Sequence, residues 1–391
     1  MEMVEEVVIV GAGIAGLATA VALRRVGVQA MVLERADGLR ATGTALTLHP
    51  NAWLALDALG VSHKLTSLYS PFKKGRMINI DLGTDRRFPL KGIANEEHGP
   101  RSVHRKTLLN ALVDELPADT IRFCSKLAAI QTEEQEGCDG VHSVVARFLR
   151  LAEAVKSGRS AARGLAVFPE GHGLESEVQQ LKYGQKRCNI ILSKNVNNLR
   201  KINRAEKFGN PELILREVTE NYARNFPQHY LEIIKHSDLS TVTWVPLMFR
   251  YPWNVILGNI SKGNVTVAGD AMHPMTPDFG QGGCAALEDA VVLGRYIGNS
   301  IIANERLLPE DIAPALAGYA TERRWRAAWL ITGSYAFWWL QQSELKWWMK
   351  FFRTAIFVLI SIFSLFNSNY NCGNLPSGSC DKSGGNSMKI D

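Results

Sequence analysis

The sequence lacks the cysteine patterns of a zinc site or a disulfide framework. Six cysteines occur among 391 residues, none forms a C-x-x-C pair, and none has a histidine at zinc-ligand spacing. We therefore expect reduced thiols and no metal. The first ten residues, MEMVEEVVIV, lack the basic region of a signal peptide and the Arg- and Ser-rich composition of a transit peptide. These absences predict a cytoplasmic protein.

The sequence also lacks a strong charge excess and a long apolar run. It has 44 basic and 38 acidic residues, a formal net charge of +6, and no long basic tract, so we expect no nucleic-acid partner. The apolar segment 355–366 is well short of the about 20 residues that span a bilayer. Trp347, Trp348 and two cations precede it. A packed terminal helix, weak membrane-surface contact through residues 347–366 and a tail anchor therefore remain open.

A strand–helix–strand pattern opens the chain. The composition, 46% hydrophobic and 21% charged, allows two or three domains with a sizeable core. Residues 7–10 (VVIV) are typical of a strand buried in a parallel sheet. Apolar residues at helical spacing follow from Ile14, Gly27 ends that helix, and residues 30–33 predict a second strand.

The turn between this strand and helix reads GAGIAG, residues 11–16. In this context Gly11 permits a tight turn, Gly13 lets a pyrophosphate approach the backbone, and Gly16 lets the helix pack on the strand. Ala15 lies within the same turn. Glu34 ends the second strand, where a carboxylate accepts hydrogen bonds from ribose hydroxyls. This pattern predicts a dinucleotide site without distinguishing NAD from FAD.

A second glycine-rich loop lies at residues 265–290, VTVAGDAMHPMTPDFGQGGCAALEDA. Asp270 follows a predicted strand and is placed to bind a sugar-alcohol chain. Gly280, Gly282 and Gly283 leave backbone N–H groups bare at the start of the next helix. Such groups, with the helix dipole behind them, stabilise negative charge on the edge of a flat ring. This loop favours FAD.

With these two loops, the chain resembles the FAD-dependent aromatic-ring monooxygenases, the family of p-hydroxybenzoate hydroxylase, salicylate hydroxylase and zeaxanthin epoxidase. It is most similar to the plant salicylate-hydroxylase-like members. The motifs GDAMHP and PDFGQGG carry the likeness, which covers residues 5–130 and 238–342. It implies that Asp270 binds the ribityl chain and that the backbone of Gly282 and Gly283 faces the isoalloxazine.

Further cofactor-binding positions are implied by the resemblance. They are Arg105 at a helix start beside FAD, Arg35 near the adenosine, Leu127 with its backbone near the adenine, and Asp139 of a D-G motif near flavin and nicotinamide. His273 is either a general base or, as the resemblance favours, a structural part of the flavin loop. The residues that catalyse the reaction cannot be named from the sequence.

Two stretches depart from the family pattern. The residues before Asp139, IQTEEQEG, are polar where the family has an apolar strand, so we infer that a hairpin and this strand are missing. Residues 182–211 are basic and Asn-rich where the family has strands of its substrate sheet. A solvated basic surface is the simplest interpretation, and an anion-binding patch is the alternative. Both departures predict an incomplete substrate domain and put catalytic competence in question.

The fold class we predict is α/β, a Rossmann-like FAD-binding domain with an inserted mixed-sheet substrate domain and a helical C-terminus. The predicted ranges are 1–60, 100–145 and 260–300 for the FAD-binding domain and 61–99 and 146–258 for the substrate domain. Residues 301–366 are assigned to C-terminal helices, and 367–391 to a disordered tail.

The resemblance implies a single-component FAD-dependent monooxygenase. NAD(P)H would reduce FAD, dioxygen would form a C4a-hydroperoxide, and a small aromatic or olefinic substrate would be oxygenated. Three alternatives stay open: a catalytically impaired flavin-binding remnant, a flavin dehydrogenase or reductase, and a membrane-surface protein. The sequence does not determine the substrate, the choice between NADH and NADPH, or the oligomeric state.

Overall fold

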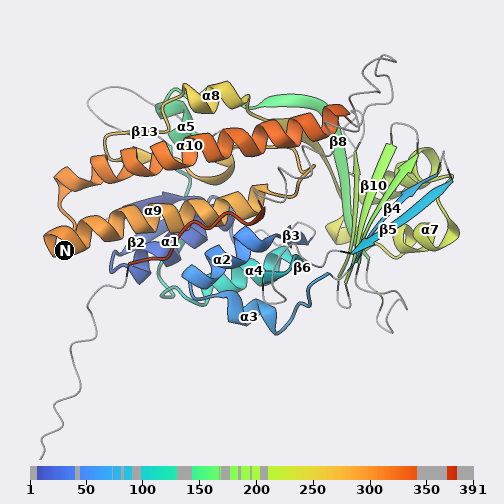
Figure 1. Ribbon diagram of the computed structural model, residues 1–391, viewed down its shortest axis with the longest axis horizontal. Coiled ribbons are helices and arrows are strands. Elements are labelled where there is room, and N and C mark those ends of the chain that lie inside the picture. Colours follow the sequence, from blue (N-terminus) through green and yellow to red (C-terminus); the bar gives the residue numbers. More distant parts are fainter. Residues whose placement is uncertain are drawn as a thin grey trace, which may run out of the picture.

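The computed structural model describes most of the chain. The described residues are 7–39, 45–72, 74–80, 83–89, 98–128, 130, 143–166, 168, 177–183, 186–193, 196–202, 210–340 and 368–376. A helix-rich part contains two long helices side by side, α9 (Gly282–Asn304) and α10 (Pro309–Leu340). A separate sheet stands at the other end of the molecule (Figure 1). The α/β class is confirmed.

The N-terminal unit forms as its sequence pattern predicts. Strand β1 (Val7–Val10) pairs in parallel with β2 (Ala30–Leu33), and α1 (Ile14–Arg25) connects them. Gly27 has φ +86°, a left-handed conformation that glycine adopts without strain, and follows the end of α1. Strand β7 (Ile121–Arg122) adds in parallel to β2. It ends after two residues, because the chain turns at Cys124, which has φ +53°.

Helices surround this sheet and form the main hydrophobic core. Leu17, Leu56, Leu108 and Leu287, from four different helices, are fully buried in it. Leu65 also packs here, so the domain boundary predicted at residue 61 falls too early. The other elements of this part are α2 (Pro50–Ala58), α3 (Ser62–Thr66), α4 (Arg105–Val113), α5 (Val144–Phe148), α8 (Pro252–Ile256), β3 (Leu46–Leu48), β6 (Arg101–Val103), β13 (Ser261–Lys262) and β14 (Val265–Thr266).

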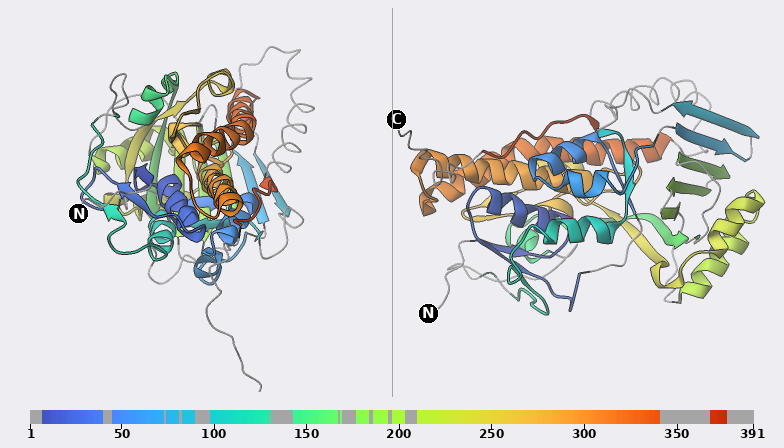
Figure 2. Two further views of the ribbon diagram at one scale, coloured as in Figure 1. Left: turned by 90° about the vertical axis from the view of Figure 1, so that its left-hand side faces the viewer. Right: turned by 90° about the horizontal axis from the view of Figure 1, so that it is seen from below.

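The second part is a seven-stranded sheet in the order β12-β8-β11-β10-β9-β4-β5. Its strands are β4 (Lys74–Asn79), β5 (Thr84–Pro89), β8 (Val155–Ala166), β9 (Glu177–Tyr183), β10 (Lys186–Ser193), β11 (Val196–Ile202) and β12 (Thr243–Phe249). Helices α6 (Pro211–Glu217) and α7 (Gln228–Lys235) cover a second core with Ala162 and Val242. Figure 2 shows the sheet from two further sides.

The prediction that basic residues 182–211 disrupt this sheet is wrong. Strands β10 and β11 pair over seven residue pairs, from Arg187 opposite Ile202 to Ser193 opposite Val196. Backbone hydrogen bonds set this pairing, and the charged and amide residues in RCNIILS and VNNLRKI do not prevent it. The basic, Asn-rich composition indicated a solvated surface and gave no sign of these strands.

One edge of β1 faces a slot. Among the described residues β1 pairs only with β2, and Val8 of this strand is 52% exposed. A cavity of about 440 Å³ lies between β1 and residues 264–268, and Leu127 and Ile130 also line it. The expectation of a strand buried on both faces is therefore wrong for β1. A missing strand before Asp139 stays a prediction, since residues 131–142 lie outside the described part, and this slot is where such a strand would fit.

The chain's last described segment, residues 368–376, packs against the helix-rich part. Cys372 is buried in the main core, and Leu375 lies at its margin. The prediction of a disordered tail beginning at 367 is therefore wrong for these residues, because the Asn- and Gly-rich composition concealed their apolar anchors.

The apolar segment 355–366 lies outside the described residues. In the part of the chain that the structure describes, no helix has the length and hydropathy to cross a bilayer.

Candidate flavin site

The first glycine turn has the geometry that its sequence predicts. Gly11 has φ +100°, which favours glycine, and Gly13 is the N-cap of α1 in an extended conformation. A Cβ on Gly16 would overlap the carbonyl oxygen of Gly11, whereas a Cβ on Gly13 would meet no protein atom within 4 Å. Gly16 is therefore required by packing inside the protein, and Gly13 leaves its backbone open to a ligand.

Glu34 is buried at the end of β2 and holds the same turn. Its Oε2 accepts a hydrogen bond from the Ala12 backbone N–H at 2.8 Å, and its Oε1 accepts one from Ala36 at 3.0 Å. A carboxylate has about four lone-pair sites, so each oxygen retains capacity for a further donor. The role of Glu34 toward ribose hydroxyls stays a prediction that this geometry permits.

The second glycine loop meets the first. Gly269 lies in the 3-10 helix η4 (Gly269–Ala271), has φ +59°, and approaches α1 so closely that a Cβ there would lie 2.7 Å from the Cβ of Ala15. A Cβ on Gly283, at the start of α9, would lie 3.7 Å from both Ile14 and Leu46. Two motifs more than 250 residues apart in the sequence thus converge at the N-terminus of α1.

The N-termini of α1 and α9 therefore both adjoin the point where the two glycine loops meet. Each has free backbone N–H groups, and each helix dipole favours an anion. Asp270 lies in η4 and is exposed. Arg163 of β8 adds a cation whose Nε is buried without a hydrogen-bond partner in the described structure. Burial lowers the pKa of the Arg163 guanidinium, Arg105 lowers it further, and Asp270 acts in the opposite direction. An anionic ligand group would complete this arrangement.

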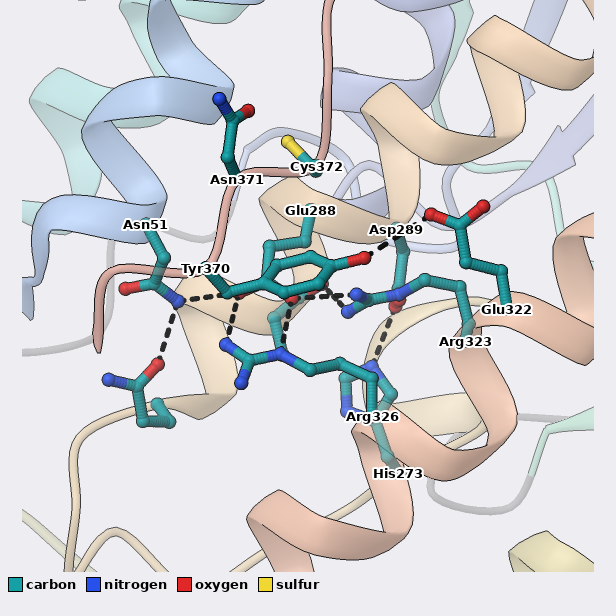
Figure 3. A network of polar contacts seen from close by, with 12 residues as sticks. Asn51, His273, Glu288, Asp289, Glu322, Arg323, Arg326, Tyr370, Asn371 and Cys372 are labelled. Atoms are coloured by element: carbon teal, nitrogen blue, oxygen red, sulfur yellow. Dashed lines mark hydrogen bonds and ion pairs between the residues drawn. The ribbon is translucent and has the colours of Figure 1, made fainter. Parts of the chain in front are cut away.

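A network of buried charged side chains from α9 and α10 holds the second glycine loop in position (Figure 3). Asp289 of α9 accepts hydrogen bonds from the Gly269 backbone at 2.8 Å and from Arg323 Nε at 2.7 Å. His273 Nε2 lies 2.6 Å from Asp289 Oδ2. Burial raises the pKa of the Asp289 carboxyl, but His273 and Arg323 outweigh it and hold that pKa well below its usual range. His273 is fully buried against Asp289, which favours the structural interpretation over the general-base one.

Glu288, the neighbouring residue on α9, forms the other half of this network. Its carboxylate accepts hydrogen bonds from Arg323 Nη1 at 2.7 Å and from Arg326 Nη2 at 2.7 Å. Asn51 of α2 donates to Glu288 at 2.6 Å and to Gln281, the N-cap of α9, at 2.9 Å. Burial raises the pKa of Glu288, and the two arginines bring it below the ordinary value. These contacts connect the start of α9 to α2 and α10.

An ion pair joins the same loop to the seven-stranded sheet. Arg159 of β8 donates two hydrogen bonds to the carboxylate of Asp278, at 3.0 Å and 2.7 Å. Both side chains are almost fully buried. A bidentate pair of this kind fixes orientation as well as distance. It sets the sheet relative to the loop PDFGQGG.

His49 precedes α2 and lies against the same loop. Its Nε2 is 3.5 Å from where a Cβ on Gly280 would lie. Burial lowers the pKa of His49 to about 4, while a hydrogen bond with the Phe279 backbone acts in the opposite direction. The imidazole is therefore neutral above about pH 5 and serves as an uncharged group at the loop.

We expect His49 to make the folded state sensitive to acid. As pH falls from about 6.5 toward 4, the unfolded chain binds a proton at His49 and the folded chain does not, so stability is lost across this window. His49→Gln removes this contribution. Urea unfolding at pH 7 and pH 5 measures it, and the variant should lose less stability between the two pH values. An equal loss in both proteins would contradict the assignment.

The structure brings most predicted site residues together, and some lie elsewhere. The residues around the two glycine loops are Gly11, Gly13, Ala15, Gly16, Glu34, Asp270, Gly280, Gly282 and Gly283. Arg105 is the first residue of α4, Arg35 is exposed after β2, and Leu127 lines the slot beside β1. Asp139 lies outside the described residues. Their cofactor contacts stay predictions.

Sequence reasoning missed the residues that support the loops. His49, Arg159, Glu288 and Arg323 were not singled out, although Glu288 and Asp289 stand inside the quoted motif. Two adjacent acids in an otherwise apolar helix are a usable signal, because buried carboxylates require cationic partners. The sequence does not reveal which distant arginines supply them.

The described residues fit a flavin dinucleotide. Gly13 exposes backbone that a side chain would cover, two helix N-termini adjoin the place where the loops meet, and Asp270 of η4 is exposed. Such an arrangement accommodates a diphosphate and a polyol chain.

Comparisons with known proteins give the same cofactor. The sequence pattern of the family described as FAD binding domain matches residues 5–136 and 136–328. Monooxygenase 2 from Arabidopsis thaliana is 38% identical, over 95% of this chain and 98% of the relative. Monooxygenase 1 from the same plant is 32% identical, over 94% and 99%. The alignment with Monooxygenase 2 runs for 404 residues, more than this chain possesses, so this chain has gaps relative to it.

A solved structure has the same fold. HpxO from Klebsiella pneumoniae, crystallised with FAD and uric acid, superposes with a TM-score of 0.77 at 20% sequence identity. The superposition covers 94% of this chain and 98% of the other.

Proposed function

This chain belongs to the FAD-dependent monooxygenase family that carries the FAD binding domain, and from that premise we propose that it oxygenates a small aromatic or olefinic molecule with electrons from NAD(P)H. The observation that supports the proposal is the convergence of the two glycine loops at the start of α1. The reaction consumes one NAD(P)H, one proton and one dioxygen. One oxygen atom enters the substrate, and the other leaves as water.

Bound FAD would accept the hydride and activate dioxygen. The chain's own residues would hold it there. Gly11 to Gly16 and Glu34 would bind the adenosine diphosphate half, Asp270 the ribityl chain, and the backbone of Gly282 and Gly283 the ring edge. The Arg159–Asp278 pair would keep the sheet against the ring and limit access of water.

Coupled measurement of the purified, FAD-loaded chain tests this proposal. NADPH and NADH oxidation and oxygen uptake would be recorded with a panel of small phenols and uric acid. We expect at least one compound to stimulate both rates equally and to yield a hydroxylated product. Hydride transfer without oxygen in the product would instead identify a dehydrogenase or reductase.

A flavin-binding remnant is a second candidate, and the slot beside β1 favours it. The family match is divided at residue 136, and the described residues that precede and follow this position in the sequence, Ile130 and Ser143, both line the slot. A remnant would bind FAD, and no compound would stimulate its NADPH oxidation. The same assay separates the two candidates.

A further inference from the structure

The C-terminal segment, residues 368–376, lies along α9 (Figures 1 and 2). Two glycines of α9 leave room for this segment. A Cβ on Gly294 would lie 2.9 Å from Leu375, and one on Gly298 would lie 2.6 Å from Pro376. Cys372 is 1% exposed, and its burial raises the pKa of the thiol to about 12. The segment is thus packed into the core and is not a loose end.

Tyr370 of this segment caps the buried charge network. Its ring lies 4.4 Å from the guanidinium carbon of Arg326 and 5.8 Å from that of Arg323 (Figure 3). Its hydroxyl donates a hydrogen bond to Glu322 at 3.2 Å. An aromatic face over a desolvated guanidinium attracts it through the negative potential of the ring face. Tyr370 therefore stabilises both arginines from the outside.

From Tyr370, two short chains of contacts lead to the glycine loops. Arg326 binds Glu288, which binds Asn51, and Asn51 binds Gln281, the residue before Gly282. Arg323 binds Asp289, which holds the Gly269 backbone. Every side chain between Tyr370 and the loops is buried, so water does not screen these contacts.

We propose that the C-terminal segment holds the two glycine loops in position through the buried charged side chains of α9 and α10, with Tyr370 as the positioning residue. The proposal rests on the proposed function, because it concerns the same cofactor site. Tyr370 itself is separated from the loops by the arginine and carboxylate layers. It acts by keeping Arg323 and Arg326 desolvated, so that each retains one orientation toward Glu288 and Asp289.

Affinity for FAD is the first test. Tyr370→Ala removes the ring and should raise the Kd for FAD by about tenfold. Tyr370→Leu fills similar space without an aromatic face and should have nearly the same effect, which keeps the test valid if the alanine variant fails to fold. Tyr370→Phe keeps the ring and should change the Kd by less than about twofold, because Glu322 retains its ion pair with Arg295.

Truncation supplies a matched control. A chain ending at residue 367 lacks the segment and should behave like Tyr370→Ala, whereas a chain ending at residue 376 retains it and should bind FAD like the full chain. Unchanged affinity in both Tyr370→Leu and the chain ending at residue 367 would overturn the proposal.

Amide hydrogen exchange of the cofactor-free protein distinguishes this proposal from the proposed function. In Tyr370→Leu we expect residues 269–283 to exchange at least about tenfold faster than in the full chain, and residues 105–113 of α4 to be unchanged. Absence of FAD binding in the full chain would refute the proposed function. Equal exchange of residues 269–283 in both proteins would refute the positioning role.

Discussion

Replacement of Glu288 by alanine lowers the free energy of unfolding by about 3–5 kcal/mol, because it leaves buried charge without its partner. Arg323 and Glu288 have side chains with no exposed surface, and that of Arg326 is 7% exposed. Without the carboxylate, Arg326 and Arg323 each lose an ion pair with residue 288, while Arg323 keeps the one with Asp289. Asn51 also loses an acceptor. Urea unfolding of the purified protein measures the loss.

Two further variants identify the cause. Glu288→Gln preserves the shape and an acceptor oxygen for Asn51, so it should cost less than the alanine variant. Glu220→Ala breaks an exposed pair with Arg216 four residues away on one helix, and should cost no more than about 0.5 kcal/mol. A loss below about 1 kcal/mol for Glu288→Ala would mean that the network is solvated and does not fix the flavin loop.

Replacement of Gly13 by alanine raises the Kd for FAD by at least about tenfold, or about 1.4 kcal/mol. A Cβ at this position meets no protein atom within 4 Å, so the fold has room for it. The expected clash is with the cofactor diphosphate, which needs bare backbone at the second glycine of the turn. Titration of the cofactor-free protein with FAD, followed by quenching of flavin fluorescence, gives the Kd.

Two control variants distinguish a lost cofactor contact in Gly13→Ala from a loss of folding stability. Gly38→Ala also adds a Cβ in open space, at a residue outside both glycine loops, and should leave both Kd and stability unchanged. Gly16→Ala places a Cβ on the Gly11 carbonyl and should lower stability before any ligand is added. If Gly13→Ala binds FAD as tightly as the unmodified chain, the diphosphate does not lie at this turn.

The sequence predicted the parts of the site that depend on residues close to one another along the chain. Gly11 requires a left-handed conformation and Gly16 requires a close helix–strand contact, and both requirements are visible in a few adjacent letters. The strands at 7–10 and 30–33 were predicted for the same reason. The second glycine loop was recognised by its composition, and the structure places its Gly269 close to Ala15 of the first loop.

The supporting network could not be predicted, because its partners are far apart along the chain. Glu288 and Arg323 are separated by 35 residues, and Tyr370 comes from a segment whose composition indicated disorder. Residues 196–202 were misjudged for a related reason. A strand in the middle of a sheet is stabilised by its neighbours' backbones, so the charged and amide side chains of β11 did not prevent its formation.

The visible absorption spectrum of the purified, full-length chain tests the central claim most directly. The claim is that the two glycine loops, at residues 11–16 and 269–283, form one FAD site. It predicts a yellow protein with the absorption bands of oxidised flavin, which releases FAD on denaturation in a ratio near one per chain. A folded protein that is colourless and stays so after incubation with FAD would contradict it.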